Sequence, residues 1–496
     1  MYSTAREASS SAPPDKRASL GPESSPSPEV SVHSRDEQGA PGQAGTTVLA
    51  GPKIAQFYGV YIKGQKAGWA EQRVTTLARG GTELWMRVVV RLARGSERTG
   101  LELIHTNRYA AGDDGGLQEV QLVQMLPNGG KAVYSGRYRD DRFVMTVTSG
   151  EKTTSTVVPA PKERAFDSVG HLLAKRLLKL GKGKTVLTYQ FDPMTMKSVP
   201  VQTTLTRKIT RFASGAEFTV LDIQGVDKAR GLNLETRLTS TGQALEMVIG
   251  PGFRLVLEDK QLAQDQSQGV PDLYRLSRVP VDKPLGSAMT ITGLRLELSG
   301  LSPNIQLSDN RQKHNARVLE VQVHEIETLE PEVLVQSEKA RWLSITPFLD
   351  HDSSIFETIL RAVQSREPVD RVRALSRAVH NAIQYTLATA PLSASEILRQ
   401  GTGDCTEYSR ALTAVLRADG IPAREVSGMA YAGDEFGFAF HAWVEAYING
   451  RWVAIDPTWD QYPVDATHIA ISRDDPSPII GLLGGLSVKV LAVERK

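Results

Sequence analysis

The chain has 496 residues, a formal net charge of +2 at pH 7 and a single cysteine, Cys405. A chain of this length is expected to hold about two to four domains. The nearly balanced charge, without blocks of Lys and Arg among aromatic residues, argues against a nucleic-acid partner. One cysteine excludes an internal disulfide framework and every multi-cysteine zinc site.

Residues 1–50 form a first segment of distinct composition. They are rich in Ser, Pro, Gly, Ala and charged residues and contain almost no large apolar ones. Such a segment cannot bury enough apolar surface to fold, so we predict a disordered tail or linker. Met1 leads into polar sequence without the apolar core of a signal peptide, and no stretch approaches the ~20 apolar residues of a membrane span. We therefore expect neither feature in the chain as it stands.

Residues 51–265 have the pattern of a β-rich domain. Short apolar and β-branched runs alternate with polar turns, which is typical of strands. The runs are Phe57–Ile62, Leu84–Leu92, Leu101–Ile104, Val120–Met125, Phe143–Val147, Val186–Phe191, Phe218–Ile223 and Leu245–Ile249. One helix is predicted among them, with an apolar stripe from Val169 to Leu180, a cap at Asp167 or Ser168 and a stop at Gly181.

Residues 266–345 are predicted to be a linker with a small β module. Residues 265–285 lack periodicity and suit a domain connection, whereas Leu294–Leu298 and Val318–Ile326 alternate as strands do. Two assignments of these strands stay open: a separate module that bridges the two halves, or an extension of the first β domain.

Residues 346–496 form the last predicted domain, and it begins with helices. Apolar residues at helical spacing predict one helix from about Ser353 and a second that opens at Pro368. A short helix is predicted at Ser395–Arg399. Because these helices precede an antiparallel hairpin, the fold class of this domain is predicted to be α+β.

Cys405 stands at the predicted start of the next helix. Asp404 and Glu407 have the spacing of a capping box, and Gly420 supplies the stop. In the first turn of a helix, unpaired backbone N–H groups and the positive end of the helix dipole favour a thiolate. The same N–H groups can bind the oxyanion of a tetrahedral intermediate. The position therefore predicts a nucleophilic thiol.

A β-hairpin follows, and its register places a His beside an Asp. Residues 441–448 alternate, and Asn449–Gly450 is a strong two-residue turn signal. With Ile448 opposite Arg451, Trp443 would face Asp456, which makes His441 and Asp456 diagonal neighbours at about 7 Å on one face. Their side chains can then form a hydrogen bond that fixes the imidazole tautomer. A slip of one residue would place them on opposite faces of the hairpin.

At these residues the sequence resembles the transglutaminase-like superfamily of papain-related thiol enzymes. This superfamily includes transglutaminases, peptide N-glycanases and many bacterial peptidase-like proteins. The resemblance covers roughly residues 350 to 490. It rests on motifs in a fixed order: Gly403-Asp404-Cys405-Thr406-Glu407, Gly420-Ile421-Pro422-Ala423-Arg424, His441-Ala442-Trp443 and Asp456-Pro457-Thr458-Trp459.

The resemblance implies a papain-like α+β core with three site residues. Cys405 would be the nucleophile, His441 the general base and acid, and Asp456 the orienting carboxylate. We predict a cysteine hydrolase that cleaves peptides or related amides through a thioester acyl-enzyme. Two alternatives stay open: a cross-linking acyltransferase that acts on protein glutamine, and a non-catalytic peptide-binding protein of the cell envelope.

Several neighbouring residues keep open roles. Trp443 and Trp459 either line a substrate groove or pack beside the site, and Glu445 is a minor competitor of Asp456 for His441. A second oxyanion donor is not identifiable from the sequence, although Gln384 is a candidate. For three other histidines, solvated or packing roles are predicted because they lack partners at metal-ligand spacing; these are His351, His380 and His468.

The expected partners are protein or peptide substrates, with no nucleic acid and no membrane span. No cofactor or metal ligand set is predicted, and monomer is the default because nothing in the sequence demands an oligomer. The resemblance favours the cell envelope or periplasm as location, and the cytoplasm is the alternative.

Overall fold

The computed structural model describes most of the chain after Ile54. The described residues are 54–94, 97–112, 116–125, 130–150, 152–159, 170–213, 216–228, 230–267, 269–302, 305–351, 354–386 and 392–496. All of them belong to one of the two units into which the chain divides, Thr47–Lys496. The predicted tail, residues 1–50, and the two predicted helix caps, Asp167 and Ser168, lie outside the described residues.

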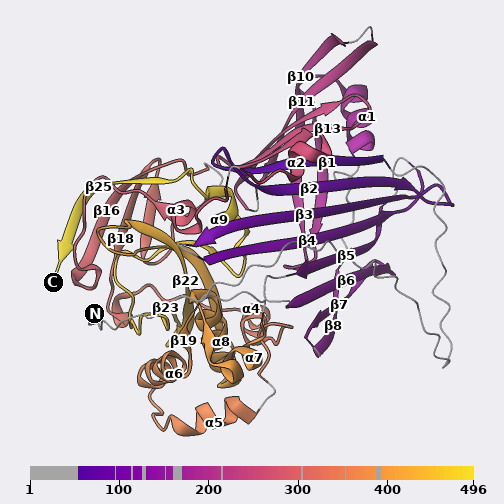
Figure 1. Cartoon of the computed structure of the whole chain (residues 1–496). Coiled ribbons are helices and arrows are strands. Elements are labelled where there is room, and N and C mark those ends of the chain that lie inside the picture. Colours follow the sequence, from indigo (N-terminus) through magenta and orange to yellow (C-terminus); the bar gives the residue numbers. More distant parts are fainter. Residues whose placement is uncertain are drawn as a thin grey trace, which may run out of the picture. The chain divides into compact units, whose positions relative to one another are not determined.

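The first half of the described chain is one antiparallel sheet of 14 strands (Figure 1). Its order is β8-β7-β6-β5-β4-β3-β2-β1-β14-β13-β12-β11-β10-β9, so nearly every strand pairs with its neighbour in sequence. The bounds are β1 Ile54–Ile62, β2 Gln65–Thr76, β3 Thr82–Arg94, β4 Glu97–Tyr109, β5 Leu117–Met125, β6 Lys131–Arg139, β7 Arg142–Ser149, β8 Lys152–Pro159, β9 Thr185–Asp192, β10 Lys197–Ala213, β11 Ala216–Asp227, β12 Leu232–Thr239, β13 Ala244–Ile249 and β14 Phe253–Glu258.

Short turns and side-chain alternation explain this sheet. Each predicted run in residues 51–265 lies within a strand. Lys63 and Gly64 join β1 to β2 with positive φ angles of 50° and 76°, a backbone conformation that suits two-residue hairpins. The predicted helix is α1, Gly170–Leu180, and it ends at Gly181, whose φ is 90°. These local predictions are confirmed for the described residues.

A second, four-stranded sheet combines distant parts of the chain. Its order is β17-β18-β16-β25, with β16 at Ile291–Ser299, β17 at Gln312–Asn315, β18 at Val318–Gln322 and β25 at Ser487–Arg495. The last strand of the chain thus pairs with β16, although the predicted domain boundaries separate the two. Helices α2 (Lys260–Gln264) and α3 (Leu273–Ser277) and strand β15 (Arg278–Val279) precede this sheet.

The C-terminal region combines helices with a five-stranded sheet. The helices are α4 Gln336–Leu343, α5 Ser354–Ala362, α6 Pro368–Ala382, α7 Ala394–Gln400, α8 Cys405–Ala418 and α9 Ser477–Leu482. The sheet runs β15-β22-β21-β24, and β23 pairs with β22. Its remaining strands are β21 Ala423–Tyr431, β22 Phe438–Ile448, β23 Arg451–Ile455 and β24 Ile469–Arg473, and a separate parallel pair joins β19 Gln384–Tyr385 to β20 Thr402–Gly403.

The α+β prediction is confirmed in part. Helices and an antiparallel sheet do form the C-terminal region, but strands dominate the described chain as a whole. No helix among the described residues is long and apolar enough to cross a membrane.

Helix α8 is the centre of the C-terminal region. It contacts β21 and β22 of the five-stranded sheet and the helices α6 and α7, and Figure 1 shows α6, α7 and β22 around it. Ala411, Leu412 and Val415 are fully buried on it, as their helical spacing predicts. Each large apolar side chain buried in this way contributes about 1.5–3 kcal/mol. The dense packing fixes the position of the first turn, where Cys405 lies.

We therefore expect Leu412→Ala to destabilise the C-terminal region by about 2–5 kcal/mol, because the truncation leaves a cavity in a closely packed core. Leu491→Ala is the matched control, since Leu491 in β25 is 38% exposed and its truncation should cost no more than about 0.5 kcal/mol. Chemical denaturation followed by tryptophan fluorescence measures both. Equal losses in the two variants would contradict the proposed core.

Candidate active site

The first turn of α8 holds Cys405 through a complete capping box. The Asp404 carboxylate accepts from the Thr406 N–H at 3.0 Å, and the Glu407 carboxylate accepts from the Asp404 N–H at 3.1 Å. Cys405 is half-buried and is the first residue of the helix. The sequence-based prediction of the cap and of the helix start is therefore confirmed.

The hairpin has the predicted register, but its strand pairing ends at Val444 and Ile455, one pair before Asp456. The pairs run from Ile448 with Arg451 to Val444 with Ile455, as predicted. After Ile455 the chain leaves the strand, and Asp456 exchanges backbone hydrogen bonds with Gln461 instead. The expected pair of Trp443 and Asp456 is thus not formed. The turn nevertheless brings Asp456 back toward β22.

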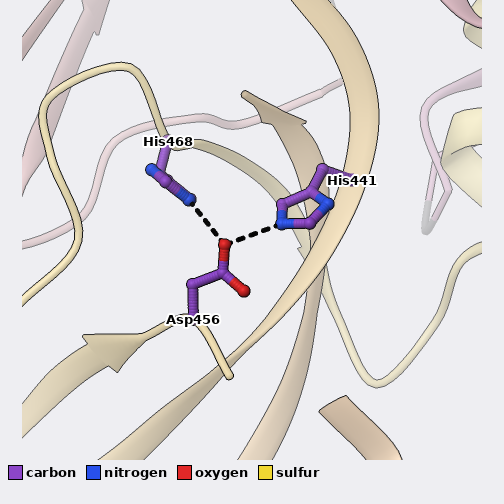
Figure 2. A group of neighbouring side chains, drawn as sticks. All are labelled: His441, Asp456 and His468. Carbon is purple, nitrogen blue, oxygen red and sulfur yellow. Dashed lines mark hydrogen bonds and ion pairs between the residues drawn. The ribbon is translucent and has the colours of Figure 1, made fainter. Parts of the chain in front are cut away.

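His441 and Asp456 form a direct hydrogen bond in the buried interior. The His441 Nε2 atom lies 2.9 Å from Asp456 Oδ2 (Figure 2). The His441 side chain is 7% exposed and that of Asp456 is 0% exposed. Asp456 Oδ1 accepts from the backbone N–H groups of Thr458 and Trp459, at 2.8 and 3.3 Å. These bonds hold the carboxylate in one orientation.

The pKa of His441 is raised above its ordinary value, and that of Asp456 is lowered. Burial favours the neutral form of each group, but the attraction between them is stronger. For His441, burial lowers the pKa while the Asp456 charge and hydrogen bond raise it, and the net result is about 9. The neighbouring Cys405 side chain also raises it. For Asp456, burial is outweighed by His441 and His468, which hold its pKa well below its usual range. An imidazolium beside a carboxylate is therefore favoured at neutral pH.

A second histidine, His468, contacts the same carboxylate. Its Nε2 atom lies 3.3 Å from Asp456 Oδ2, and its Nδ1 atom lies 3.3 Å from Asp465 Oδ1. His468 is 0% exposed. Of the solvated or packing roles expected from the sequence, the solvated one is wrong because His468 is fully buried, and the sequence spacing did not reveal its two carboxylate partners. No periodic pattern signals it, because it lies in the irregular segment between β23 and β24.

Two tryptophans flank His441 in different ways. Trp459 stacks on the imidazole with a centroid distance of 4.3 Å and an interplanar angle of 10°, and it stays 39% exposed. Trp443 is 0% exposed and belongs to a buried cluster with Val426 and Val464. Of the two roles left open, Trp443 therefore packs, whereas Trp459 covers the imidazole and still presents a surface.

Glu445 does not compete for His441. Its carboxylate accepts from Arg424 at 2.7 Å and from Arg473 at 2.9 and 3.0 Å. Burial opposes the charge of Glu445, but the two guanidinium groups lower its pKa to about 2. The minor alternative that it replaces Asp456 is thus contradicted.

Three other residues were singled out in the sequence, and one of them, His380, is hydrogen-bonded to the turn that carries Asp456. Gln384 is exposed in β19, which pairs with Thr402–Gly403 just before Cys405, and its role as an oxyanion donor stays a prediction. His380 on α6 hydrogen-bonds to the Pro457 carbonyl through Nδ1 at 2.9 Å, so it contacts the turn that carries Asp456. His351 makes an edge contact with Phe356.

The ligand atoms of His441, Asp456 and His468 lie within 4.8 Å of one another, a spacing that a metal ion could bridge. The ring nitrogens that would bind such an ion lie 2.9 and 3.3 Å from Asp456 Oδ2, and the second nitrogen of His468 faces Asp465. In this structure these groups are therefore hydrogen-bonded to carboxylates.

Comparison with known proteins gives a consistent picture for this region. Residues 357–457 match the sequence profile of the transglutaminase-like superfamily. The chain is 30% identical over 136 residues to an uncharacterised protein of Mycobacterium leprae, a match that covers 25% of this chain and 48% of that protein. It is 35% identical over 104 residues to a protein-glutamine gamma-glutamyltransferase of Pseudomonas aeruginosa, covering 18% of this chain and 15% of that one.

A further match is the kyphoscoliosis peptidase of Homo sapiens, with 28% identity over 114 residues, 21% of this chain and 17% of the peptidase. The chain thus spans less than half the length of each of these relatives. Among solved structures, a beta-barrel-like protein of Brucella abortus covers 42% of this chain and is itself covered to 98%, with 11% identity and a TM-score of 0.33. A score this low supports no conclusion about fold.

We expect Asp456→Asn to lower the pKa of His441 from about 9 to the ordinary value near 6.5 or below, because burial then acts without an opposing charge. NMR titration of ¹⁵N-labelled histidine rings measures it. Asp460→Asn is the control, since it makes the same change in the same turn at a carboxylate that pairs with Arg377 instead. An unchanged titration midpoint of His441 in Asp456→Asn would show that Asp456 does not raise the pKa of His441.

Proposed function

We propose that the protein is a thiol hydrolase of peptides or related amides, and the match of residues 357–457 to the profile of the transglutaminase-like superfamily supports this proposal. Cys405 is the nucleophile, His441 the general base and acid, and Asp456 the orienting carboxylate. The observation that carries the proposal is the position of Cys405 on the first turn of α8, beside a buried His441–Asp456 pair.

In the first step the Cys405 thiolate attacks the amide carbonyl carbon and forms a tetrahedral oxyanion. The Asp404 side chain accepts from the N–H groups of Thr406 and Glu407, which leaves the Cys405 N–H outside the cap. That N–H and the helix dipole stabilise the oxyanion. A backbone donor of this kind needs no rearrangement during the reaction.

In the second step the carbon–nitrogen bond breaks and the His441 imidazolium gives its proton to the leaving amine. The acyl group remains on Cys405 as a thioester. Because Nε2 of His441 is bound to Asp456, its other nitrogen is the one that serves the thiol and the leaving group. Neutral His441 then takes a proton from the attacking water, and the acid is released from Cys405.

Water is the favoured acceptor of the acyl group because the site is partly open. Cys405 is half-buried, and Trp459, which covers His441, is 39% exposed. Acyl transfer to an amine is the second candidate, and the similarity to a relative named protein-glutamine gamma-glutamyltransferase favours it. Both reactions share the thioester and differ only in the group that attacks it.

We expect Cys405→Ala to lower peptide hydrolysis by roughly a thousandfold or more, because the thioester can no longer form. The assay is mass spectrometry of a mixed peptide pool incubated with the purified chain. Thr406→Ala is the matched control, since Thr406 is the exposed next residue of the same helical turn and its backbone N–H is retained. Hydrolysis that survives Cys405→Ala would refute the nucleophile.

The same assay separates the two acceptors. With an excess of a fluorescent primary amine and a glutamine-containing peptide, a hydrolase yields mainly the carboxylic acid, whereas a transferase yields the amide of the added amine. Tight peptide binding without turnover, equally strong in Cys405→Ser, would instead indicate the non-catalytic binding protein.

A further inference from the structure

Two imidazoles converge on a single carboxylate oxygen. Figure 2 shows His441 and His468 both directed at Oδ2 of Asp456, at 2.9 and 3.3 Å. The other oxygen of Asp456 is bound to backbone N–H groups of the following turn. The catalytic role proposed for the first histidine accounts for only one of these two contacts.

Both ring nitrogens of His468 face carboxylate oxygens. Its Nε2 faces Asp456 and its Nδ1 faces Oδ1 of Asp465, each at 3.3 Å. An ionised carboxylate can only accept, so two ionised partners require both ring nitrogens of His468 to donate, and the ring is then an imidazolium. The direction of its pKa agrees: burial lowers it, but the hydrogen bonds and charges of the two carboxylates raise it overall.

Asp465 is held through one of its two oxygens, Oδ1, whereas its buried Oδ2 has no hydrogen-bond partner among the described residues. Its Oδ1 also accepts from the backbone N–H of Thr467 at 2.8 Å and from the Thr467 hydroxyl at 2.6 Å. The Arg311 guanidinium donates to the Asp465 carbonyl at 3.0 Å. Burial favours neutral Asp465, but His468 and Thr467 lower its pKa to about 2. A carboxylate on each side therefore keeps the positive charge of His468 in place.

This charge matters most when His441 becomes neutral. In the proposed reaction His441 gives its proton to the leaving amine, which would leave Asp456 as a buried carboxylate beside an uncharged ring. A buried charge without a counter-charge is costly and tends to take up a proton. An adjacent imidazolium that does not take part in the reaction removes this cost.

We propose that His468, held by Asp465, is a positioning residue: a lasting imidazolium that keeps Asp456 charged and directed at His441 throughout the catalytic cycle. The inference rests on the proposed thiol hydrolysis. It also assigns a function to the segment between β23 and β24, which supplies both Asp465 and His468.

The charged and titratable groups around His441 define the expected effect. They are Cys405 from α8, Asp456 after β23, and His468, whose ring centroid lies 5.9 Å from that of His441. Loss of the positive charge of His468 removes a like-charge repulsion. His441 should then hold its proton more tightly and be a weaker acid toward the leaving amine.

The first experiment needs no variant. In the full chain labelled with ¹⁵N-histidine, the ring nitrogen signals of the nine histidines are followed from pH 5 to 10. Two rings, His441 and His468, should titrate above the ordinary histidine value near 6.5, because carboxylates face both of them. A single ring that titrates above that value would overturn the proposal.

The second experiment measures the coupling. His468→Gln keeps a donor for Asp456 but carries no charge, and it should shift the titration midpoint of His441 upward by roughly one to two pH units. Asp465→Asn is the second variant if the first does not fold. This substitution leaves the imidazole of His468 in place but lowers the affinity of that ring for its proton. The titration midpoint of His441 should therefore also shift upward.

His380→Gln is the matched control, because His380 also hydrogen-bonds to the turn, at the Pro457 carbonyl, without touching Asp456. It should leave the His441 midpoint at the wild-type value. An unchanged or lowered midpoint in a folded His468→Gln variant would overturn the proposal, because loss of a neighbouring positive charge must strengthen the binding of the His441 proton.

Failure of the wider proposal is recognisable separately. If iodoacetamide labels wild-type Cys405 only near the pH of a free thiol, about 8.5, the proposed hydrolase itself fails. If wild-type Cys405 is labelled rapidly below pH 7 but His468→Gln leaves the His441 midpoint unchanged, only the positioning role of His468 fails.

Discussion

The burial of one carboxylate, Asp456, is the constraint on which the site depends. A carboxylate with no exposed surface is stable in its charged form only if charged or hydrogen-bonding partners surround it. Here two backbone N–H groups donate hydrogen bonds to Oδ1, and the imidazoles of His441 and His468 are hydrogen-bonded to Oδ2. The hairpin, the turn after β23 and the segment before β24 each supply one part of this arrangement. Their packing around a rigid α8 brings Cys405 beside His441.

The support extends into the four-stranded sheet. Gln312 of β17 both donates to and accepts from the backbone of Ala470, at 2.8 and 3.0 Å, and Arg311 binds the carbonyl of Asp465. Gln312 is the first residue of β17, and Arg311 comes directly before it. The last strand of the chain, β25, is the opposite edge strand of the same sheet. Sheet and site are thus joined by buried polar contacts, which are strong only when every partner is satisfied.

The parts of the site that follow local rules could be predicted from the sequence. The capping box at Asp404, the hairpin turn at Asn449–Gly450 and the alternation before it depend on residues only a few positions apart, and together they bring Cys405, His441 and Asp456 into proximity. The contact of His468 with Asp456 could not be predicted in this way. It depends on an irregular segment without periodicity, and the pairing of β16 with β25 joins residues nearly 200 positions apart.

The most direct test of the central claim is the rate of Cys405 alkylation as a function of pH, in the purified chain and in His441→Ala. The account predicts rapid labelling at about pH 6 in the wild-type chain, and its loss or a shift to higher pH in the variant, because a thiolate–imidazolium pair then no longer forms. Slow labelling that rises only near the free-thiol value of about 8.5, and that is unchanged by the substitution, would contradict it.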